Sequence, residues 1–251
     1  MATHCVFIHR GYHEYFENVI AITKFYNPNN KIVLIGDETT EHLGEKYNID
    51  FFFIKEFEED IPYYHFSTNL ELYEKFCFQR WFIIKNFMNK YSIFSILHSD
   101  SDNIICYDFS KLEYTNAITR NYEIADGVVP NILFIDQHTV NKVTSFYLSL
   151  YSLPILEFVK EICNFADQNN KDTIHYSDMF FLTQCYRTLK IQCDFLDETD
   201  SDIIFNTNIE FLKDLQLVDK VFYNNDSLVF NVHFAGLHKD EIKNWRVSLD
   251  I

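Results

Sequence analysis

The chain has 251 residues, a formal net charge of −16 and a hydrophobic fraction of 47% that includes 26 Phe and 16 Tyr. This composition excludes an intrinsically disordered chain, and the excess of acid argues against general nucleic-acid binding, which depends on Lys and Arg facing phosphates. The length suits one large α/β domain with a sizeable core. An anionic ligand would therefore need locally concentrated positive charge or a bound metal.

The six cysteines are scattered along the chain, show no Cys-x-x-Cys spacing and mostly lie in apolar runs. This pattern favours buried free thiols in a reducing compartment. The N-terminal stretch lacks the apolar core of a signal peptide, because His4 and His9 interrupt it. No run approaches the length of a membrane span, so we expect a cytoplasmic protein that does not cross a membrane.

The first 54 residues alternate between short apolar runs and helical periodicity. The predicted elements, in chain order, are a strand at residues 5–8, a helix at 15–26, a strand at 31–37, a short helix ending near 47 and a strand at 50–54. Thr39 or Thr40 is the expected N-cap of the short helix. Strands that alternate with helices predict a parallel sheet with right-handed crossovers.

Glycine is scarce, since the whole chain has only five glycines. The first strand is not followed by a Gly-x-Gly-x-x-Gly turn, and the sequence contains no P-loop. A nucleotide bound at this sheet would find no glycine-rich cradle for its phosphates, and a metal ion would fill that role.

A long helix is predicted at residues 69–91, where apolar side chains recur at i+3 and i+4 along one wide face. Arg80 lies within this face. A guanidinium in that place needs an anionic partner or must extend out of the apolar surface. Two interpretations stay open: an internal ion pair with an Asp, or a contact with a ligand at the carboxyl edge of the sheet.

The acidic turn Asp100-Ser101-Asp102 lies between the apolar runs 94–97 and 104–107, which predict two short strands. In open α/β sheets, ligands bind at the carboxyl ends of the strands. Two carboxylates on one turn attract a hard divalent cation such as Mg²⁺ or Mn²⁺, which keeps open positions for phosphate oxygens. A second triplet, Asp200-Ser201-Asp202, follows a polar run and is interpreted as a solvated loop.

The second half of the chain continues the same domain, because no repeat or interdomain linker interrupts it. The expected elements are strands at 127–129 and 132–135, helices at 139–151, 153–166 and 178–189, and a hairpin of residues 221–223 and 228–234. Ser177 is the expected N-cap of the 178–189 helix. Asp178, in its first turn, is interpreted as a favourable acid at a helix N-terminus, and a functional role for it stays open.

The last apolar strand leads into the sequence NVHFAGLHK at residues 231–239. With the acidic turn upstream, this ending resembles metal-dependent glycosyltransferases of the GT-A fold. It is most similar to the glycogenin and galactosyltransferase-like group, which ends in His-Phe/Tyr-x-Gly-x-x-Lys. His233, Gly236 and Lys239 fall at the matching positions, whereas Asp240-Glu241 replaces the usual Pro-Trp after the Lys.

The resemblance implies a single GT-A-like (Rossmann-like) α/β domain over residues 1–251, with a mixed, mostly parallel central sheet flanked by helices. Residues 1–102 would form the nucleotide-binding half, and residues 103–251 the acceptor-binding half with the C-terminal metal and phosphate motif. The implied ligands of Mn²⁺ (or Mg²⁺) are Asp100, Asp102 and His233. The implied donor contacts are Ile8, His9, Arg10, Asp37, Arg80, Ser101, Gly236 and Lys239, with Lys239 at the diphosphate.

The predicted reaction moves a sugar from a nucleotide-diphosphate donor, UDP-linked in preference to GDP-linked, to a hydroxyl of a carbohydrate or glycoconjugate. The C-terminal motif favours retention of configuration, whereas an inverting enzyme would need a carboxylate such as Asp178 to deprotonate the acceptor. The alternatives are a sugar nucleotidyltransferase, which normally carries a glycine-rich N-terminal loop, and a non-catalytic sugar-nucleotide-binding module on the same fold. The oligomeric state stays open.

Overall fold

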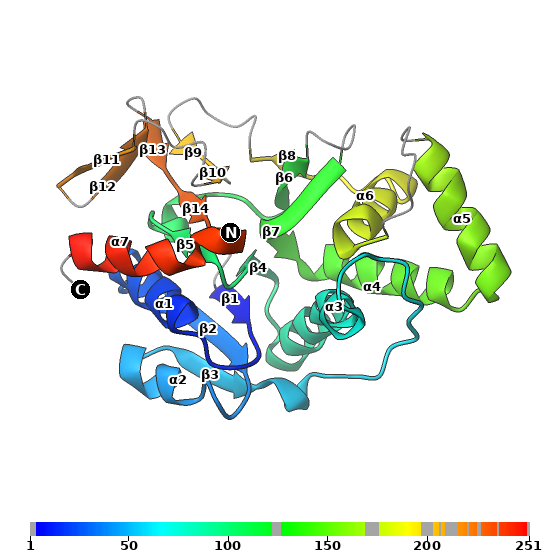
Figure 1. Ribbon diagram of the computed structural model, residues 1–251, viewed down its shortest axis with the longest axis horizontal. Coiled ribbons are helices and arrows are strands. Elements are labelled where there is room, and N and C mark those ends of the chain that lie inside the picture. The colour runs from blue at the N-terminus through cyan, green and yellow to red at the C-terminus, as the bar shows by residue number, and fades with distance from the viewer. Residues whose placement is uncertain are drawn as a thin grey trace.

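A seven-stranded sheet forms the centre of the protein. The computed structural model describes residues 4–121, 127–168, 176–196, 203–205, 207–208, 215–219, 221–224, 227–234 and 236–249. The strands of this sheet are β1 (His4–Ile8), β2 (Lys31–Gly36), β3 (Asp50–Phe53), β4 (Ser95–Ser99), β6 (Ala117–Asn121), β7 (Gly127–Asp136) and β8 (Asp194–Phe195). They lie in the order β3-β2-β1-β4-β7-β6-β8 (Figure 1).

The sheet is mixed and mostly parallel, as the sequence predicts. Strands β3, β2, β1 and β4 run parallel, and β7 runs antiparallel to both β4 and β6. The pairing of Phe7 with Ser99 sets the carboxyl ends of β1 and β4 side by side. His9 and Asp100, which follow these strands, therefore start from neighbouring points of one sheet edge.

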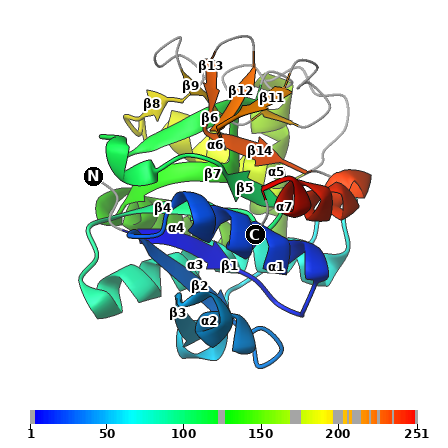
Figure 2. The ribbon, with the colours of Figure 1, turned by 90° about the vertical axis from the view of Figure 1, so that its left-hand side faces the viewer.

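Helices cover both faces of the sheet. They are α1 (Glu14–Tyr26), α2 (His42–Tyr47), α3 (Glu71–Tyr91), α4 (Gln137–Tyr151), α5 (Ile155–Gln168), α6 (Asp178–Thr188) and α7 (Ile242–Leu249), with short 3₁₀ turns η1 (Ile54–Glu56), η2 (Phe109–Lys111) and η4 (Gly236–Glu241). Figures 1 and 2 show α3, α4 and α6 on one face and α1 with α7 on the other. None of the described helices combines the length and apolar character needed to cross a bilayer.

Two apolar clusters fill the space between the sheet and its helices, one on each face. Val6 and Ile8 of β1 belong to the cluster that contains the buried side of α3, whereas Cys5 and Phe7 belong to the cluster that contains the buried side of α1. Successive strand residues face opposite sides, so a strand covered on both faces is apolar throughout. This arrangement explains the continuous apolar runs of β1 and β2. All six cysteines are free thiols.

A three-stranded sheet joins the acidic turn to the C-terminal part of the chain. It consists of β10 (Thr207–Asn208), β14 (Asn231–His233) and β5 (Asn103–Ile105), in that order. β14 pairs antiparallel with β5, and His233 stands opposite Asn103. This register brings His233 next to Asp102, although about 130 residues separate them in the sequence. A four-stranded sheet is formed by β9 (Ile203–Ile204), β11 (Leu215–Val218), β12 (Val221–Asn224) and β13 (Ser227–Val229).

The prediction of two strands at 127–129 and 132–135 is wrong, because these residues form the single strand β7. Its partner β6 was not predicted. Pro130 lacks an N–H for the ladder, but the pairing of β6 with β7 shifts register between Ile118 and Thr119, opposite Pro130. A bulge at that point tolerates a residue without a donor, so the strand continues through it.

Two further local predictions need correction. The predicted strand at 228–234 is two strands, because β13 pairs with β12 in the expected hairpin while β14 pairs with β5. The predicted cap of α2 by Thr39 or Thr40 is absent, since α2 begins after Glu41 and the Thr39 hydroxyl instead donates to Asp37. The triplet at residues 200–202 lies outside the described residues.

The long helix α3 confirms the prediction for residues 69–91, but the N-terminal end of its apolar face is uncovered. Leu70, which precedes the first helical residue, is 81% exposed, and Tyr73 is 59% exposed. The predicted cap of α6 is confirmed, because the Ser177 hydroxyl accepts a hydrogen bond from the Phe180 N–H.

Candidate active site

Backbone hydrogen bonds hold the acidic turn after β4 from several sides. The Asp100 N–H donates to the Asn131 carbonyl on β7 (2.8 Å), and the Asn103 N–H donates back to the Asp100 carbonyl (3.2 Å). The Phe234 N–H, directly after β14, donates to the Asp102 carbonyl (2.8 Å). The two carboxylates therefore project from a well-anchored turn at the edge of the sheet.

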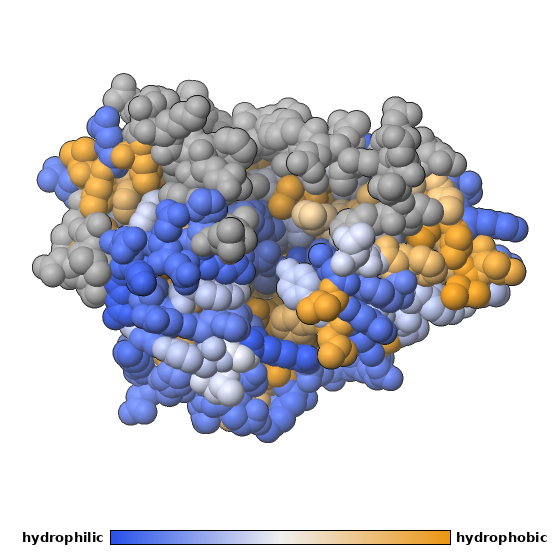
Figure 3. Space-filling view, in the orientation of Figure 1, coloured by the Kyte–Doolittle hydropathy of each residue, from blue (hydrophilic) through white to orange (hydrophobic). Residues whose placement is uncertain are grey.

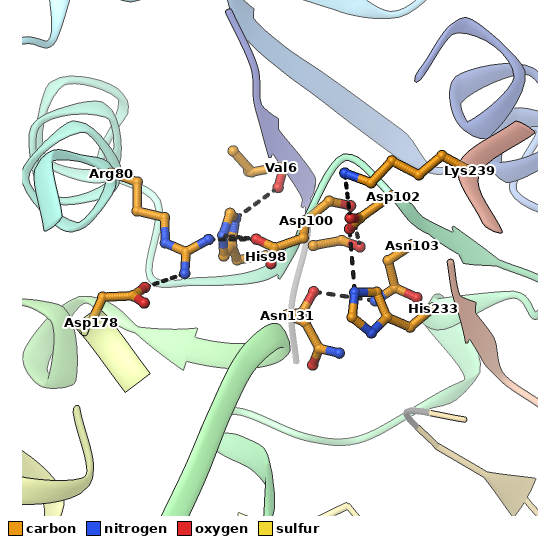
Figure 4. Close-up of polar contacts among 11 residues, drawn as sticks. Val6, Arg80, His98, Asp100, Asp102, Asn103, Asn131, Asp178, His233 and Lys239 are labelled. Carbon is orange, nitrogen blue, oxygen red and sulfur yellow. Dashed lines mark hydrogen bonds and ion pairs between the residues drawn. The ribbon is translucent and has the colours of Figure 1, made fainter. Parts of the chain in front are cut away.

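Three buried asparagines extend this bonding beneath the turn. Asn103 Nδ2 donates to the Asn131 carbonyl (3.1 Å), and Asn231 Nδ2 donates to Asn103 Oδ1 (2.8 Å). The sequence analysis missed these residues, although an Asn beside apolar strand residues indicates a buried polar pair. The hydrogen bond from Asn231 to Asn103 ties β14 to β5 and so places His233 against the turn, and Figure 4 shows Asn103 beside His233 and bonded to Asn131.

Asp102, His233 and Lys239 form one cluster. His233 Nε2 lies 3.4 Å from Asp102 Oδ1, and Lys239 Nζ lies 2.9 Å from Asp102 Oδ2 (Figure 4). Burial alone would raise the pKa of Asp102, but the contact with His233 and the charge of Lys239 outweigh it and lower that pKa to about 2. Burial would lower the pKa of His233, but Asp102 raises it overall. The carboxylate of Asp102 is thus a stable anion between two nitrogen groups.

Arg80 of α3 pairs with two carboxylates, Asp100 on the acidic turn and Asp178 at the start of α6 (Figure 4). All three side chains are mostly buried, and burial raises the pKa of both Asp100 and Asp178 against the opposing charge of Arg80. Glu74 Oε1 in turn accepts the Asp178 N–H (3.0 Å). The predicted internal ion pair of Arg80 is therefore present.

His98, on β4 just before the turn, is a site residue that the sequence analysis missed. It is 1% exposed, its Nδ1 lies 3.1 Å from the Val6 carbonyl, and its Nε2 lies 3.8 Å from Asp100 Oδ1. Burial, together with the charge of Arg80, lowers its pKa to about 3, so the imidazole is neutral at neutral pH. A histidine inside the apolar run that precedes the two carboxylates was the available signal.

A cavity of about 370 Å³ opens at this edge of the sheet. The predicted site residues that line it are Ile8, His9, Arg10, Arg80, Asp100, Ser101, Asp102 and Lys239. The lining residues that were not predicted are His13, Tyr15, Leu72, Tyr73, Phe76 and Cys77. Most of these come from α1 and α3, whose distance from the acidic turn the sequence does not reveal. Both interpretations of Arg80 are compatible with the structure, because it is ion-paired and also faces the cavity.

Asp37 and Asp178 are predicted site residues that do not line the cavity. Asp37 Oδ2 accepts the Gly11 N–H (2.7 Å), and Gly11 has a φ of +79°, which favours glycine. Asp37 thereby shapes the loop after β1 that carries His9 and Arg10. Its predicted contact with the base or ribose stays a prediction, as does the acceptor-side role of Asp178.

His233 is not among the lining residues that the structure describes, but both His233 and Gly236 are connected to residues that line the cavity. Gly236 is the first residue of η4, the short turn that carries Lys239. His233 reaches the site through Asp102. Lys239 Nζ also lies 5.0 Å from the centre of the Tyr15 ring, which places the ammonium over an aromatic face.

Two carboxylates and an imidazole are chemically suited to Mn²⁺, which accepts both oxygen and nitrogen ligands. The charges of Asp102 and His233 both act on the pKa of Asp100, the former raising it and the latter lowering it. Among the described residues, however, no three His, Cys, Asp or Glu side chains form a ready-made metal site. Arg80 holds Asp100 and Lys239 holds Asp102. The residue types therefore suit the cation, whereas the two ion pairs occupy the carboxylates in the described arrangement.

No protein-family model matches the sequence, and a search of curated proteins finds no match. Solved structures do match. An active-site mutant of LgtC is 12% identical, with 98% of this chain and 95% of that chain covered and a TM-score of 0.53. Mouse xyloside xylosyltransferase 1 is 11% identical, with 83% and 88% covered and a TM-score of 0.55. The chain has the GT-A fold.

A third GT-A structure is the glycosyltransferase GlyE of Streptococcus pneumoniae TIGR4, which is 13% identical with a TM-score of 0.54. The match covers 100% of this chain and 62% of the GlyE chain. At these identities the likeness establishes the GT-A fold alone. The fold class expected from the sequence is thereby confirmed.

Proposed function

We propose that this protein is a glycosyltransferase that moves a sugar from a nucleotide-diphosphate donor, UDP-linked in preference to GDP-linked, to the hydroxyl of a carbohydrate or glycoconjugate acceptor. The observation that carries the proposal is the cluster of Asp102, His233 and Lys239, of which Asp102 and Lys239 line the cavity. Two sequence motifs about 130 residues apart converge there, on a fold shared with structures named as glycosyltransferases.

In this proposal Asp100, Asp102 and His233 hold Mn²⁺ or Mg²⁺. The bound cation supplies positive charge to the diphosphate oxygens of the donor. Lys239 adds a second positive group, and its contact with Asp102 raises its pKa against the effect of burial, so it stays charged. Positive groups fixed where the leaving diphosphate gains negative charge stabilise the transition state more than the ground state.

Arg80 would face the donor sugar or its phosphates from the wall formed by α3, since it lines the cavity with its charge already held by two carboxylates. Asp178 lies behind Arg80, with its side chain 8% exposed. A general base must reach the acceptor hydroxyl, and Asp178 instead contacts the guanidinium. This placement supports a retaining reaction, which requires no such base.

The second candidate is a non-catalytic sugar-nucleotide-binding module. The ion pairs of Arg80 with Asp100 and of Lys239 with Asp102 favour it, because they occupy the two carboxylates that a metal-dependent transferase would need for its cation. A sugar nucleotidyltransferase has no comparable support, since the loop after β1 carries only Gly11.

Calorimetric titration of UDP and GDP, each with and without Mn²⁺, tests the proposal. We expect UDP to bind and Mn²⁺ to tighten that binding, and we expect UDP-sugars to be hydrolysed slowly when no acceptor is present. Binding of a nucleotide without any Mn²⁺ dependence and without turnover would favour the binding module. Failure of both nucleotides to bind the folded protein would refute both readings.

A further inference from the structure

Three apolar side chains stand exposed at the N-terminal end of α3, and two of them line the cavity. Leu70 is 81% exposed, Leu72 is 83% exposed and Tyr73 is 59% exposed, and the last two line the cavity. Figure 3 shows apolar surface beside the hollow on this face of the molecule. Single exposed leucines are common on protein surfaces, but three apolar side chains within four residues at one cavity are a local feature of this site.

The exposed residues begin a continuous wall along α3. Leu72, Tyr73, Phe76, Cys77 and Arg80 all line the cavity, and their spacing places them on one side of the helix. Leu72 lies in solvent, whereas Cys77 and Arg80 are 8% and 9% exposed. With a rise of 1.5 Å per residue, the wall from residue 72 to residue 80 is about 12 Å long. It leads from the apolar rim to the guanidinium.

The lining residues that come from outside α3 have a different character. They include His9, His13, Asp102 and Lys239, and their charged groups are the ones that suit a diphosphate and its cation. A nucleotide-diphosphate donor therefore belongs beside those groups. Arg80, at the inner end of the α3 wall, faces the donor, so the outer apolar part of this wall is left to the second substrate, which approaches the reacting sugar from the mouth of the cavity.

We propose that the acceptor is a glycoside with an apolar aglycone, and that this aglycone lies against Leu72 and Tyr73. The proposal rests on the proposed glycosyltransferase function and specifies its acceptor class. A single sugar ring is shorter than the wall along α3, so an acceptor that reaches Arg80 with its sugar extends its aglycone to the rim. Burial of the aglycone against exposed apolar side chains would supply the affinity.

The test compares n-octyl β-D-glucopyranoside, kept below its micelle-forming concentration, with methyl β-D-glucopyranoside in calorimetric titrations. We expect the octyl glycoside to bind at least about tenfold more tightly, because a buried apolar chain contributes more than one factor of ten in affinity. Leu72→Glu should reduce octyl binding by about tenfold or more. The matched control is Leu156→Glu, which changes a leucine of α5 that is 74% exposed and does not line the cavity.

The outcomes are decisive in both directions. Equal binding of the two glycosides, binding of neither, or the same loss in Leu72→Glu and Leu156→Glu would overturn the proposal. A concentration-dependent dimer that Leu72→Glu abolishes would also overturn it, since a second copy would then cover the rim.

A parallel titration with UDP and Mn²⁺ separates this proposal from the function on which it rests. We expect the Leu72→Glu variant to bind UDP like the wild type, because Leu72 lies on the part of α3 that we assign to the acceptor. Since the Leu72 side chain is exposed, we expect the substitution to leave the fold intact. A wild-type protein that binds the octyl glycoside through Leu72 and yet fails to bind UDP would refute the glycosyltransferase function. Leu72 would then belong to a site for apolar ligands.

Discussion

Replacing Lys239 with Met should change two affinities in opposite directions. Lys239 Nζ lies 2.9 Å from Asp102 Oδ2, on a carboxylate that we assign to the cation. Lys239→Met removes this positive charge and keeps a side chain of similar length over Tyr15. Mn²⁺ alone should then bind more tightly, because its competitor for Asp102 is gone. UDP should bind more weakly, because its diphosphate loses a cationic partner.

The size of both changes follows from the contact itself. A hydrogen bond between charged groups contributes about 1.5–3 kcal/mol, and the lower end applies here because the Lys239 side chain is 33% exposed. Since about 1.4 kcal/mol corresponds to a factor of ten, Mn²⁺ should bind about tenfold more tightly in the variant. The loss of the bond to the diphosphate should weaken UDP about 10- to 100-fold in the presence of Mn²⁺.

The assay measures free Mn²⁺ by electron paramagnetic resonance without nucleotide, and UDP binding by calorimetry at saturating Mn²⁺. Lys243→Met is the matched control, because Lys243 is an exposed lysine on α7, four residues further along the chain. We expect that control to leave both affinities unchanged. Weaker Mn²⁺ binding in Lys239→Met would refute the competition between lysine and cation. Unchanged UDP affinity would refute the contact with the diphosphate.

Three further predictions concern single residues. Asp102→Ala should abolish Mn²⁺-dependent UDP binding and lower turnover by at least about 100-fold, because even residues behind a metal ligand contribute 10- to 100-fold; unchanged Mn²⁺-dependent turnover would contradict its metal role. Arg80→Lys should weaken donor binding, seen as a raised KM, more than it weakens the fold, because Lys lacks the planar fork of the guanidinium. A large loss in melting temperature with an unchanged KM for donor would make Arg80 purely structural. Glu17→Gln should destabilise the protein by about 1–3 kcal/mol at pH 7, since the Lys46, Tyr12 and Tyr47 contacts of Glu17 outweigh burial and lower its pKa to about 2. This difference in the free energy of unfolding between wild type and variant is fully present above about pH 4.5 and disappears as the pH falls toward 2. Urea unfolding that gives the same difference at about pH 7 and at about pH 2 would contradict the prediction.

Much of the central sheet could be predicted because burial on both faces leaves a simple signal. β1 and β2 are continuous apolar runs, and the acidic turn follows β4 without an intervening loop. These features depend on local sequence. The GT-A fold followed from them together with the C-terminal motif, and the structural matches confirm it.

The contacts that build the site are not local, and the sequence does not contain their register. His233 reaches Asp102 because β14 pairs with β5, and the Asn231–Asn103 hydrogen bond fixes that pairing. Periodicity placed Arg80 on the apolar face of α3 but did not reveal that it pairs with both Asp100 and Asp178. Such pairings depend on how three elements pack together, which the sequence pattern of any one element does not specify.

The apolar face of α3 also shows that the sequence pattern of one element does not specify its packing partners. Helical periodicity groups Leu70 and Tyr73 with residues such as Trp81, yet Trp81 is 1% exposed while the other two face solvent. Spacing tells which residues share a face but not how far a packing partner extends along it. The uncovered end of this face is where we propose that the acceptor binds.

The proposed metal and donor roles would explain how a chain with a net charge of −16 accepts an anionic donor. In the structure two cationic side chains, Arg80 and Lys239, are each held by a carboxylate of the acidic turn. When a divalent cation takes over Asp100 and Asp102, both cationic side chains become available to the diphosphate. Binding of the cation and of the nucleotide should therefore be cooperative, because each releases the partner that the other needs. By reciprocity, UDP must tighten Mn²⁺ binding by the same factor by which Mn²⁺ tightens UDP binding.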